Sequence, residues 1–179
     1  MWVFGYGSLT WNVDFPYEEF RVGYVTGFSR RFWQGDVDHR GIPGACGRVV
    51  TLVENEQECV WGMAYKLADH QVNDVIAHLD RREKCGYHTI QVTFYPKDVN
   101  PEPFTVAVYF APVGNPWYLG PASLDQMARE IASRSGPKGH NSEYLLRLAE
   151  TVRNIIPEQK DDHLFELEAK VKELMALAN

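Results

Sequence analysis

The stretch Val3-Phe4-Gly5-Tyr6-Gly7-Ser8-Leu9 decides the fold, because it joins a short apolar strand to an abrupt break. Residues 2–4 are aromatic or β-branched, which predicts a buried strand. Glycines at alternate positions then let the backbone take positive φ and approach another group closely. Backbone N–H groups turned inward form a concavity that binds a carboxylate, or an oxygen that becomes negative during a reaction.

An ordinary strand end with a glycine turn is the commoner explanation of this pattern taken alone. The stretch lacks the third glycine of a dinucleotide-binding fingerprint. No Gly-Lys-Ser or Gly-Lys-Thr follows, as a phosphate-binding loop would require. The anion-binding turn is therefore a hypothesis that other parts of the chain must support.

The composition predicts one globular domain, residues 1–179, with an apolar content of 45% that suffices for a core. The net charge of −6 argues against nucleic acid or an anionic membrane as a partner. No segment approaches the roughly 18 consecutive apolar residues of a membrane helix. Three widely spaced cysteines without a Cys-x-x-Cys motif, and a start unlike a signal peptide, favour a cytosolic protein with reduced thiols.

Alternating apolar residues predict a sheet in the first 110 residues. The segment 20–33 alternates with a period of two, and Gly23 and Gly27 would let this long strand bend as a small barrel requires. The polar turn 55–58 predicts a hairpin between its two flanking strands. The predicted strands are 2–4, 20–33, 48–54, 59–66, 87–95 and 104–110.

Helical periodicity appears once among the strands and dominates after residue 111. An apolar stripe over residues 72–79 predicts a helix that stops by Gly86. Ser123 and Asn141 are predicted to cap later helices. The helices over about 123–178 are expected to pack on the barrel, although the last stripe would also suit a dimer seam.

Strands followed by helices indicate the α+β class. We predict a small, closed or nearly closed mixed β-barrel of about six strands with flanking helices.

Glu83 is an ionisable residue in an unusual place, at the C-terminal end of the first predicted helix. The helix dipole disfavours a carboxylate there, and shielding from water would raise its pKa further. Such a carboxylate is a better base for taking a proton from an ammonium group. A charged, solvated helix end is the commoner explanation when this residue is considered alone.

A metal site is not expected. Asp36, Asp38 and His39 lie in the long polar loop 34–47, but no second cluster at ligand spacing accompanies them.

Several stretches together resemble one known family. They are Gly5-Tyr6-Gly7-Ser8-Leu9, Arg31-Phe32-Trp33-Gln34-Gly35, Asp38-His39-Arg40-Gly41, Gly47-Arg48-Val49-Val50-Thr51-Leu52, Arg82-Glu83-Lys84-Cys85-Gly86-Tyr87 and Asn141-Ser142-Glu143-Tyr144-Leu145. In this order and spacing they resemble the ChaC family of glutathione-specific γ-glutamylcyclotransferases, and within it a small second animal member. The resemblance covers nearly the whole chain.

The resemblance implies a γ-glutamylcyclotransferase-like fold and a reaction without a cofactor. The α-amine of the γ-glutamyl group of reduced glutathione would attack its own γ-carbonyl, giving 5-oxoproline and Cys-Gly. Glu83 matches the family's catalytic glutamate and would act as general acid and base. Neither nucleic acid nor membrane is implied as a partner, and the protein would be a cytosolic monomer or homodimer.

The resemblance also implies substrate-binding residues. The opening strand and turn would hold the γ-glutamyl group, which makes Val3, Phe4, Gly5, Tyr6, Gly7, Ser8 and Leu9 candidates. Tyr144 matches a tyrosine near the substrate, and a core aromatic on a helical stripe is an equal alternative. Arg40 could pair bidentately with a substrate carboxylate, an interpretation from residue type and loop position.

The chain departs from the family pattern at two positions. Thr10 follows the turn where an aliphatic residue is usual, and Cys85 stands two residues after Glu83 where glycine is frequent. Two other functions remain open. The chain could cyclise other γ-glutamyl dipeptides or amines, or it could be a binding module that lost the activity.

Overall fold

The fold is that of a computed structural model, which describes residues 1–179 apart from 84, 85, 99, 159 and 179. The strands are β1 (Trp2–Gly5), β2 (Glu19–Asp36), β3 (Gly47–Lys66), β4 (His88–Pro96), β5 (Phe104–Phe110), β6 (Ser135–Gly136) and β7 (Gly139–His140). The helices are α1 (Val72–Arg82), α2 (Leu124–Ser133), α3 (Asn141–Ile155) and α4 (Asp162–Leu177), with 3₁₀ turns η1 (Ser8–Thr10) and η2 (Asp69–Gln71).

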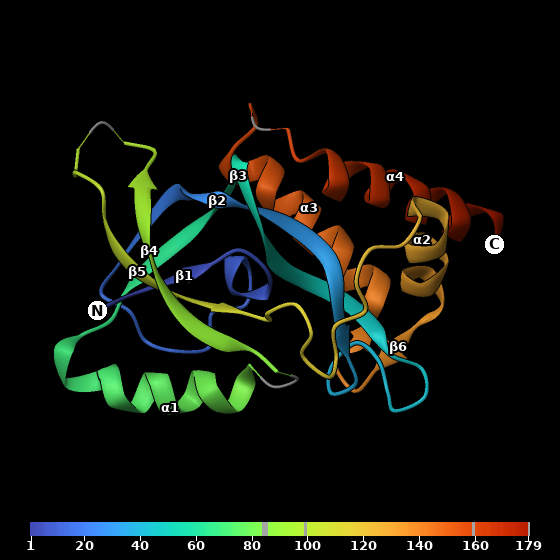
Figure 1. The fold of residues 1–179 in the computed structure, drawn as a ribbon, viewed down its shortest axis with the longest axis horizontal. Helices are drawn as coiled ribbons and strands as arrows, with labels where there is room; N and C mark the ends of the chain where they lie inside the picture. The colour runs from blue at the N-terminus through green and yellow to red at the C-terminus, as the bar shows by residue number, and fades with distance from the viewer. Residues whose placement is uncertain (84–85, 99, 159, 179) are drawn as a thin grey trace.

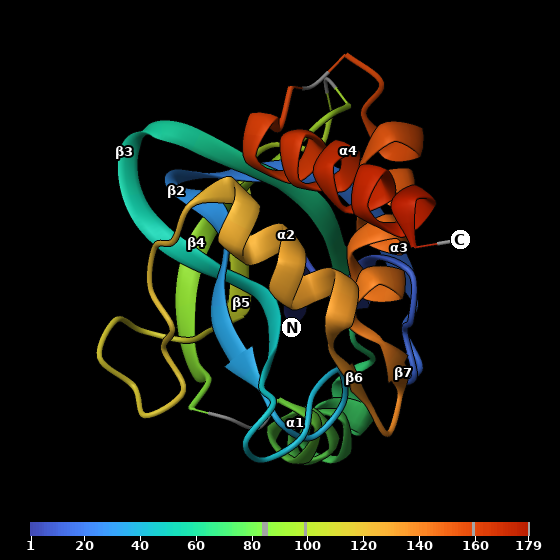
Figure 2. The ribbon, with the colours of Figure 1, turned by 90° about the vertical axis from the view of Figure 1, so that its right-hand side faces the viewer.

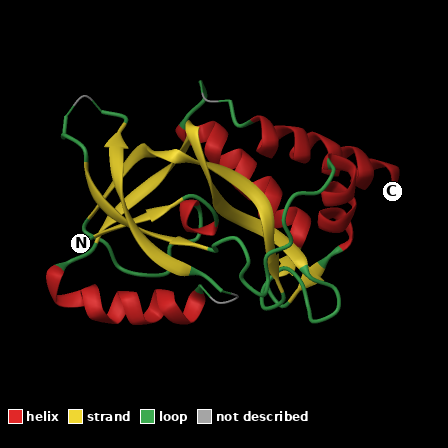
Figure 3. Ribbon diagram, viewed as in Figure 1, coloured by secondary structure: helices red, strands yellow, loops and turns green. Residues whose placement is uncertain are grey.

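Five strands close into a barrel in the order β1-β3-β2-β4-β5 (Figure 1). All neighbours are antiparallel except β1 and β5, which pair in parallel and close the barrel. The sheet is therefore mixed, and with the helices around it (Figure 3) the fold is α+β, as predicted. The barrel has five strands because two predicted strands are parts of one.

The predicted hairpin at residues 55–58 is wrong: β3 runs without a break from Gly47 to Lys66. Its register against β2 shifts where these polar residues lie, from Thr26 opposite Cys59 to Phe28 opposite Glu54. Gly27, between the two pairs on β2, has a φ of 84°. The extra polar residues are thus absorbed as a bulge that twists the strand pair, since a bulge and a turn give the same local sequence signal.

Gly23 lets two strands of the barrel cross closely. A Cβ atom at this position of β2 would lie 2.3 Å from the carbonyl oxygen of Tyr95 and 2.4 Å from the ring of Phe94, both on β4. A side chain there would push the strands apart, so the glycine serves the bend that the sequence predicted.

Helices α2, α3 and α4 lie together on one side of the barrel, and α1 lies apart from them (Figure 2). Leu145, Leu148 and Leu164 are fully buried in the cluster that also contains barrel side chains. The C-terminal helices therefore pack on the barrel of their own chain. None of the described helices is long and apolar enough to cross a membrane.

Helix α1 covers the barrel through the predicted apolar stripe. Val75 and Leu79 are buried in a second cluster, with Val3 and Tyr65 from the barrel. This packing fixes the direction of α1 and hence the place where its C-terminal end arrives.

The two predicted helix caps have different outcomes. Ser123 caps α2 and accepts a hydrogen bond from the N–H of Gln126 at 3.2 Å, as predicted. The cap at Asn141 is wrong, because His140 is the N-cap of α3. The buried Asn141 amide instead bonds both the N–H and the carbonyl of Arg48, each at 2.7 Å. Without Asn141, the buried N–H and carbonyl of Arg48 would lack these partners. The free-energy cost of leaving both groups unsatisfied exceeds the gain from one helix cap.

Candidate active site

The turn after β1 is as tight as the glycines predicted. A Cβ on Gly5 would lie 2.6 Å from the Cβ of Leu9. The N–H and hydroxyl of Thr10 both donate to the carbonyl of Gly7, at 2.9 and 2.8 Å. Within the described part of the chain, the N–H groups of Gly7, Ser8 and Leu9 donate to no backbone acceptor. The turn therefore carries donors that are free for a ligand.

Two adjoining cavities lie beside this turn. One has a volume of about 490 Å³ and the other of about 40 Å³. They share four lining residues, Ser8, Glu83, Tyr87 and Tyr144. The narrow cavity has room for about one small polar group, and the wide one is the size of a site for a small organic ligand.

The structure brings most of the predicted site residues together around these cavities. Residues 4–9, Glu83 and Tyr144 line the narrow cavity, and Arg40 lines the wide one. Val3 is not among the described lining residues, because its side chain is buried against α1 and its backbone pairs with β3 and β5.

Glu83 directly follows the last residue of α1, where its N–H donates to the carbonyl of Leu79 at 2.7 Å. Its side chain is only 17% exposed, and one carboxylate oxygen lies 3.5 Å from Nε of Arg82. Burial raises the pKa of Glu83, and the positive charges of Arg82 and His39 oppose the shift without cancelling it. The carboxylate therefore accepts a proton more readily than an exposed glutamate does.

Arg82 connects the end of α1 to the turn, a role that no pattern in the sequence predicts. Its guanidinium donates to the hydroxyl of Ser8 at 3.0 Å and to the carbonyl of Asn12 at 2.9 Å, and it pairs with Asp14. These contacts use most of its donors, so Arg82 neutralises Glu83 only partly. The one available signal was its place next to Glu83 in the quoted motif.

Tyr144 places a hydroxyl against the turn. This oxygen accepts a hydrogen bond from the N–H of Val50 at 3.4 Å, and a Cβ on Gly7 would lie 2.9 Å from it. The ring also packs edge-on against Trp11, with centroids 5.2 Å apart. Burial raises the pKa of Tyr144, so its hydroxyl keeps its proton and can donate it to a ligand.

Tyr87 is a second buried tyrosine of the site, and no pattern in the sequence distinguishes it. Its hydroxyl donates to the carbonyl of Val50 at 2.8 Å. Burial raises its pKa well above the ordinary value. Tyr87 and Tyr144 thus hydrogen-bond the same residue of β3, because Tyr87 binds the carbonyl of Val50 and Tyr144 binds its N–H.

Arg40 reaches the wide cavity from the loop between β2 and β3. The carboxylate of Asp36 accepts the N–H groups of residues 38, 39 and 40, which shapes this loop. The Arg40 guanidinium donates to Glu143 at 2.9 Å and to the carbonyl of His140 at 3.1 Å. The positive charge of Arg40 is thus partly neutralised by Glu143, and the pairing of Arg40 with a substrate stays a prediction.

Among the described residues, no group of three or more His, Cys, Asp or Glu side chains is placed to hold a metal ion. Cys46 and Cys59 are free thiols. Cys85 and its neighbour Lys84 lie outside the described residues.

Comparison with known proteins gives consistent results for sequence and structure. A family model described as ChaC-like protein matches residues 1–174. The chain is 49% identical over 166 residues to glutathione-specific gamma-glutamylcyclotransferase 1 of Mus musculus, covering 92% of this chain and 74% of that protein. It is 36% identical over 190 residues to glutathione-specific gamma-glutamylcyclotransferase of Schizosaccharomyces pombe, covering 98% and 94%.

A crystal structure of the yeast γ-glutamylcyclotransferase specific to glutathione is similar throughout. The TM-score is 0.87 at 26% sequence identity, over 97% of this chain and 98% of the yeast chain. The barrel and its helices thus form the same fold in both proteins.

Proposed function

The chain belongs to the ChaC family, and from this premise we propose that it is a glutathione-specific γ-glutamylcyclotransferase. It cleaves reduced glutathione to 5-oxoproline and Cys-Gly. The observation that carries the proposal is the wall shared by the two cavities. There Glu83, with its raised pKa, stands beside the N–H groups of Gly7, Ser8 and Leu9, which bond no backbone acceptor in the described part of the chain. The identity of 49% to the mouse enzyme supports the same substrate.

The reaction needs a free amine and a stabilised oxyanion. Glu83 takes a proton from the α-ammonium of the γ-glutamyl group, and the freed nitrogen attacks the γ-carbonyl carbon. The new C–N bond closes a five-membered ring, and the bond to the cysteine nitrogen breaks. Glu83 returns that proton to the leaving nitrogen and takes the second proton, which the attacking nitrogen loses as it becomes the ring N–H. This second proton ends on the amine of Cys-Gly, so the atoms of one glutathione are divided between 5-oxoproline and Cys-Gly with no water consumed.

Positioning supplies much of the acceleration, because ring closure is fast once the γ-glutamyl chain is held folded. The N–H groups of Gly7, Ser8 and Leu9 are the donors for the α-carboxylate and for the oxygen that becomes negative. The Tyr144 hydroxyl, next to Gly7, is a further donor to the substrate.

The wide cavity suits the rest of the tripeptide. Its volume of about 490 Å³ lies within the range of small-ligand sites. Cationic side chains line it next to acidic ones: Arg40 from the β2–β3 loop, Lys138 from the turn between β6 and β7, and Arg147 from α3. These charges complement the terminal carboxylate of glutathione, and Arg40 has the fork geometry that binds a carboxylate.

The experiment is product analysis with the purified, chelator-treated protein and reduced glutathione. We expect 5-oxoproline and Cys-Gly in equal amounts. Product from γ-glutamyl-alanine and none from glutathione would indicate a cyclotransferase for other γ-glutamyl compounds. Saturable binding of both without product would indicate a binding module.

We propose four further properties from the same resemblance. Residues 1–179 act as one domain, because α2–α4 share their core with the barrel. The chain is the second animal member of the family; identities of 49% to the mouse and 47% to the Danio rerio first member are nearly equal, as expected for a separate lineage. It works in the cytosol, as the free thiols favour, and as a monomer or homodimer, which sedimentation would decide.

A further inference from the structure

Arg30 is a buried arginine of β2 that the mechanism does not use. Its side chain is 2% exposed. Its guanidinium donates to the carbonyl of Tyr6 at 3.0 Å and to the carbonyl of Trp61 at 2.7 Å. A buried charge is costly unless it is paired and hydrogen-bonded, so these contacts need a counter-charge.

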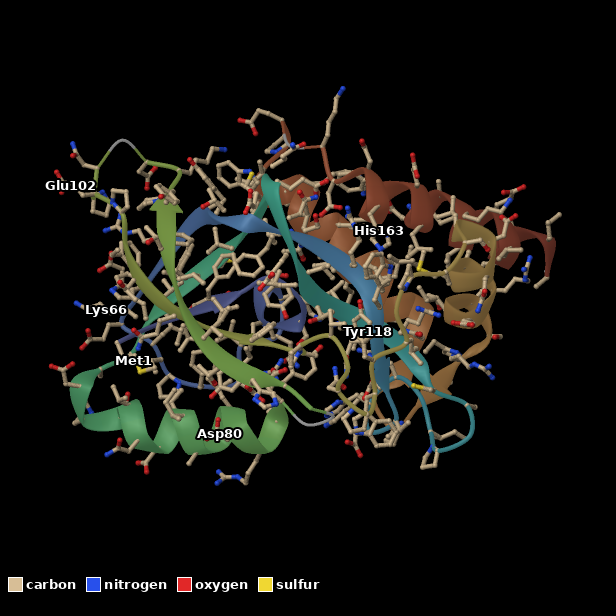
Figure 4. All side chains as sticks on the ribbon, viewed as in Figure 1. Met1, Lys66, Asp80, Glu102, Tyr118 and His163 are labelled. Carbon is tan, nitrogen blue, oxygen red and sulfur yellow. The ribbon has the colours of Figure 1, made fainter. Side chains whose placement is uncertain are left out.

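Asp161 supplies that counter-charge from the start of α4. One carboxylate oxygen lies 3.2 Å from Nε of Arg30, and the other accepts the N–H of Leu164 at 3.1 Å as the helix cap. His163, labelled in Figure 4, accepts the N–H of Phe32 at 3.0 Å. Burial lowers the pKa of His163 to about 4, so the imidazole is neutral and adds no second positive charge beside Arg30. Asp161 supplies the negative charge that balances Arg30.

The contact with Tyr6 fixes a peptide group of the turn. The Tyr6–Gly7 peptide bond is trans, so the carbonyl of Tyr6 and the N–H of Gly7 point in opposite directions. Arg30 lines a third cavity of about 520 Å³ that shares no described lining residue with the two cavities of the site. Gly7 lines the narrow cavity of the site. Holding the carbonyl toward Arg30 therefore turns the Gly7 N–H away from Arg30, toward the side of the substrate.

We propose that Arg30 is a positioning residue, which aims the Gly7 N–H at a substrate oxygen by binding the carbonyl of Tyr6. The proposal rests on the proposed function, because the substrate oxygen is that of a γ-glutamyl group. A charged donor on the carbonyl also polarises the peptide group and strengthens the hydrogen bond that the Gly7 N–H donates. Asp161 keeps Arg30 in place, which couples α4 to the site.

Arg48 offers a matched control because it is equally buried and serves only the fold. It is 3% exposed, pairs with Glu130, and donates to the carbonyls of Phe32 and Gly120. It lines none of the three cavities among the described residues. A role in stability alone would give lysine variants of the two arginines similar values of kcat/KM.

The experiment compares Arg30→Lys with Arg48→Lys by steady-state kinetics on glutathione, thermal unfolding and the ¹³C chemical shift of the Tyr6 carbonyl. A lysine keeps the charge but cannot reach two carbonyls and a carboxylate together. We expect both variants to lose similar stability. Only Arg30→Lys should lose about 100-fold in kcat/KM, since misplacing one oxyanion-type donor costs that much. Only Arg30→Lys should shift the Tyr6 resonance.

A kcat/KM of Arg30→Lys within threefold of Arg48→Lys overturns the proposal, as does a loss of activity with an unchanged Tyr6 resonance. A wild-type protein without 5-oxoproline release overturns the proposed function instead. If Arg30→Lys does not fold, Asp161→Asn decides, because asparagine is as good a helix cap as aspartate. That variant should fold and lose about fivefold in kcat/KM, because Arg30 loses its ion pair with Asp161 but keeps both carbonyl acceptors. Full activity in Asp161→Asn overturns the proposal.

Discussion

Glu83 and Glu168 are two nearly buried carboxylates in two regions of the molecule, and their surroundings are opposite. Glu168, on α4, is 4% exposed and pairs with Arg153 and with Lys172, the latter at 2.7 Å. Burial raises its pKa, but these ion pairs outweigh burial and the net pKa is lowered. Glu83 has Arg82 at 3.5 Å, and burial prevails. The α3–α4 contact keeps its glutamate charged, whereas the cavity keeps its glutamate ready to accept a proton.

The difference lies in how the nearby cations are used. Arg153 and Lys172 both direct donors at the same carboxylate. Arg82 instead donates hydrogen bonds to Ser8 and Asn12 and pairs with Asp14. A cation close to a base is therefore compatible with a raised pKa when its hydrogen bonds are committed elsewhere. The same contacts that hold the turn in place thus keep Glu83 basic.

The largest expected effect separates the two glutamates by activity. Glu83→Gln keeps the shape of the side chain and removes the base, so turnover of glutathione should fall at least about 100-fold while substrate still binds. Glu168→Gln is the control and should turn over glutathione at the wild-type rate. The two values come from 5-oxoproline release and from calorimetric binding of glutathione. Equal turnover in Glu83→Gln would remove Glu83 from the mechanism.

The second effect separates them by stability. Glu168→Gln should lower the free energy of unfolding at pH 7 by about 1–3 kcal/mol, because Arg153 and Lys172 lose a charged acceptor. The lowered pKa of Glu168 means that its stabilisation is present above its ordinary value of 4.5 and is lost as the pH falls through the lowered value. Urea unfolding of variant and wild type should therefore differ at neutral pH and converge in acid. A constant difference at all pH values would contradict the ion-pair explanation.

The third effect uses pH to test the state of Glu83 directly. Since its pKa is raised, the acid limb of kcat/KM should have its midpoint above 4.5, with a tenfold loss per pH unit below the midpoint. Circular dichroism must show that the protein stays folded over this range.

His39 faces the same cavity and is the control for this profile. Its positive charge lowers the pKa of Glu83, so His39→Gln should keep the acid limb and move it to higher pH. Loss of the limb in His39→Gln would assign the titration to the histidine. A midpoint at or below 4.5 in the wild type would mean that Glu83 is not shifted.

The sequence predicts those parts of the site that depend on local patterns. The glycine turn at residues 5–9 and Glu83 at a helix end each follow from a few neighbouring residues, and the structure brings them together. Periodicity also located the strands, although the polar segment 55–58 could not distinguish a turn from a bulge. That choice depends on the register against β2, which no local pattern contains.

The contacts that adjust the site are between residues far apart in the sequence. Arg82 binds Ser8 and Asp14, and Asn141 binds the backbone of Arg48. Arg30 reads as part of a basic pair on a strand face, and only the fold shows that it is buried against Tyr6. The roles of these residues depend on buried hydrogen bonds and ion pairs. Their partners are distant in the sequence and come together only in the folded chain.

The smallest expected effect is on stability, where the two glutamine variants should change in opposite directions. A raised pKa in the folded state means that Glu83 is held in its charged form at a cost at pH 7. Glu83→Gln should therefore raise the unfolding temperature at pH 7 by about 2 °C, whereas Glu168→Gln lowers it. At a pH below the pKa of Glu83 in both the folded and the unfolded protein, its carboxyl group is protonated in both states. The gain in stability should therefore vanish in acid. Calorimetric scans at neutral and acidic pH measure both changes. A loss of stability in Glu83→Gln at pH 7 would mean that Arg82 stabilises the charged Glu83 as strongly as Arg153 and Lys172 stabilise Glu168. The two glutamates would then differ in their location and not in their electrostatic surroundings.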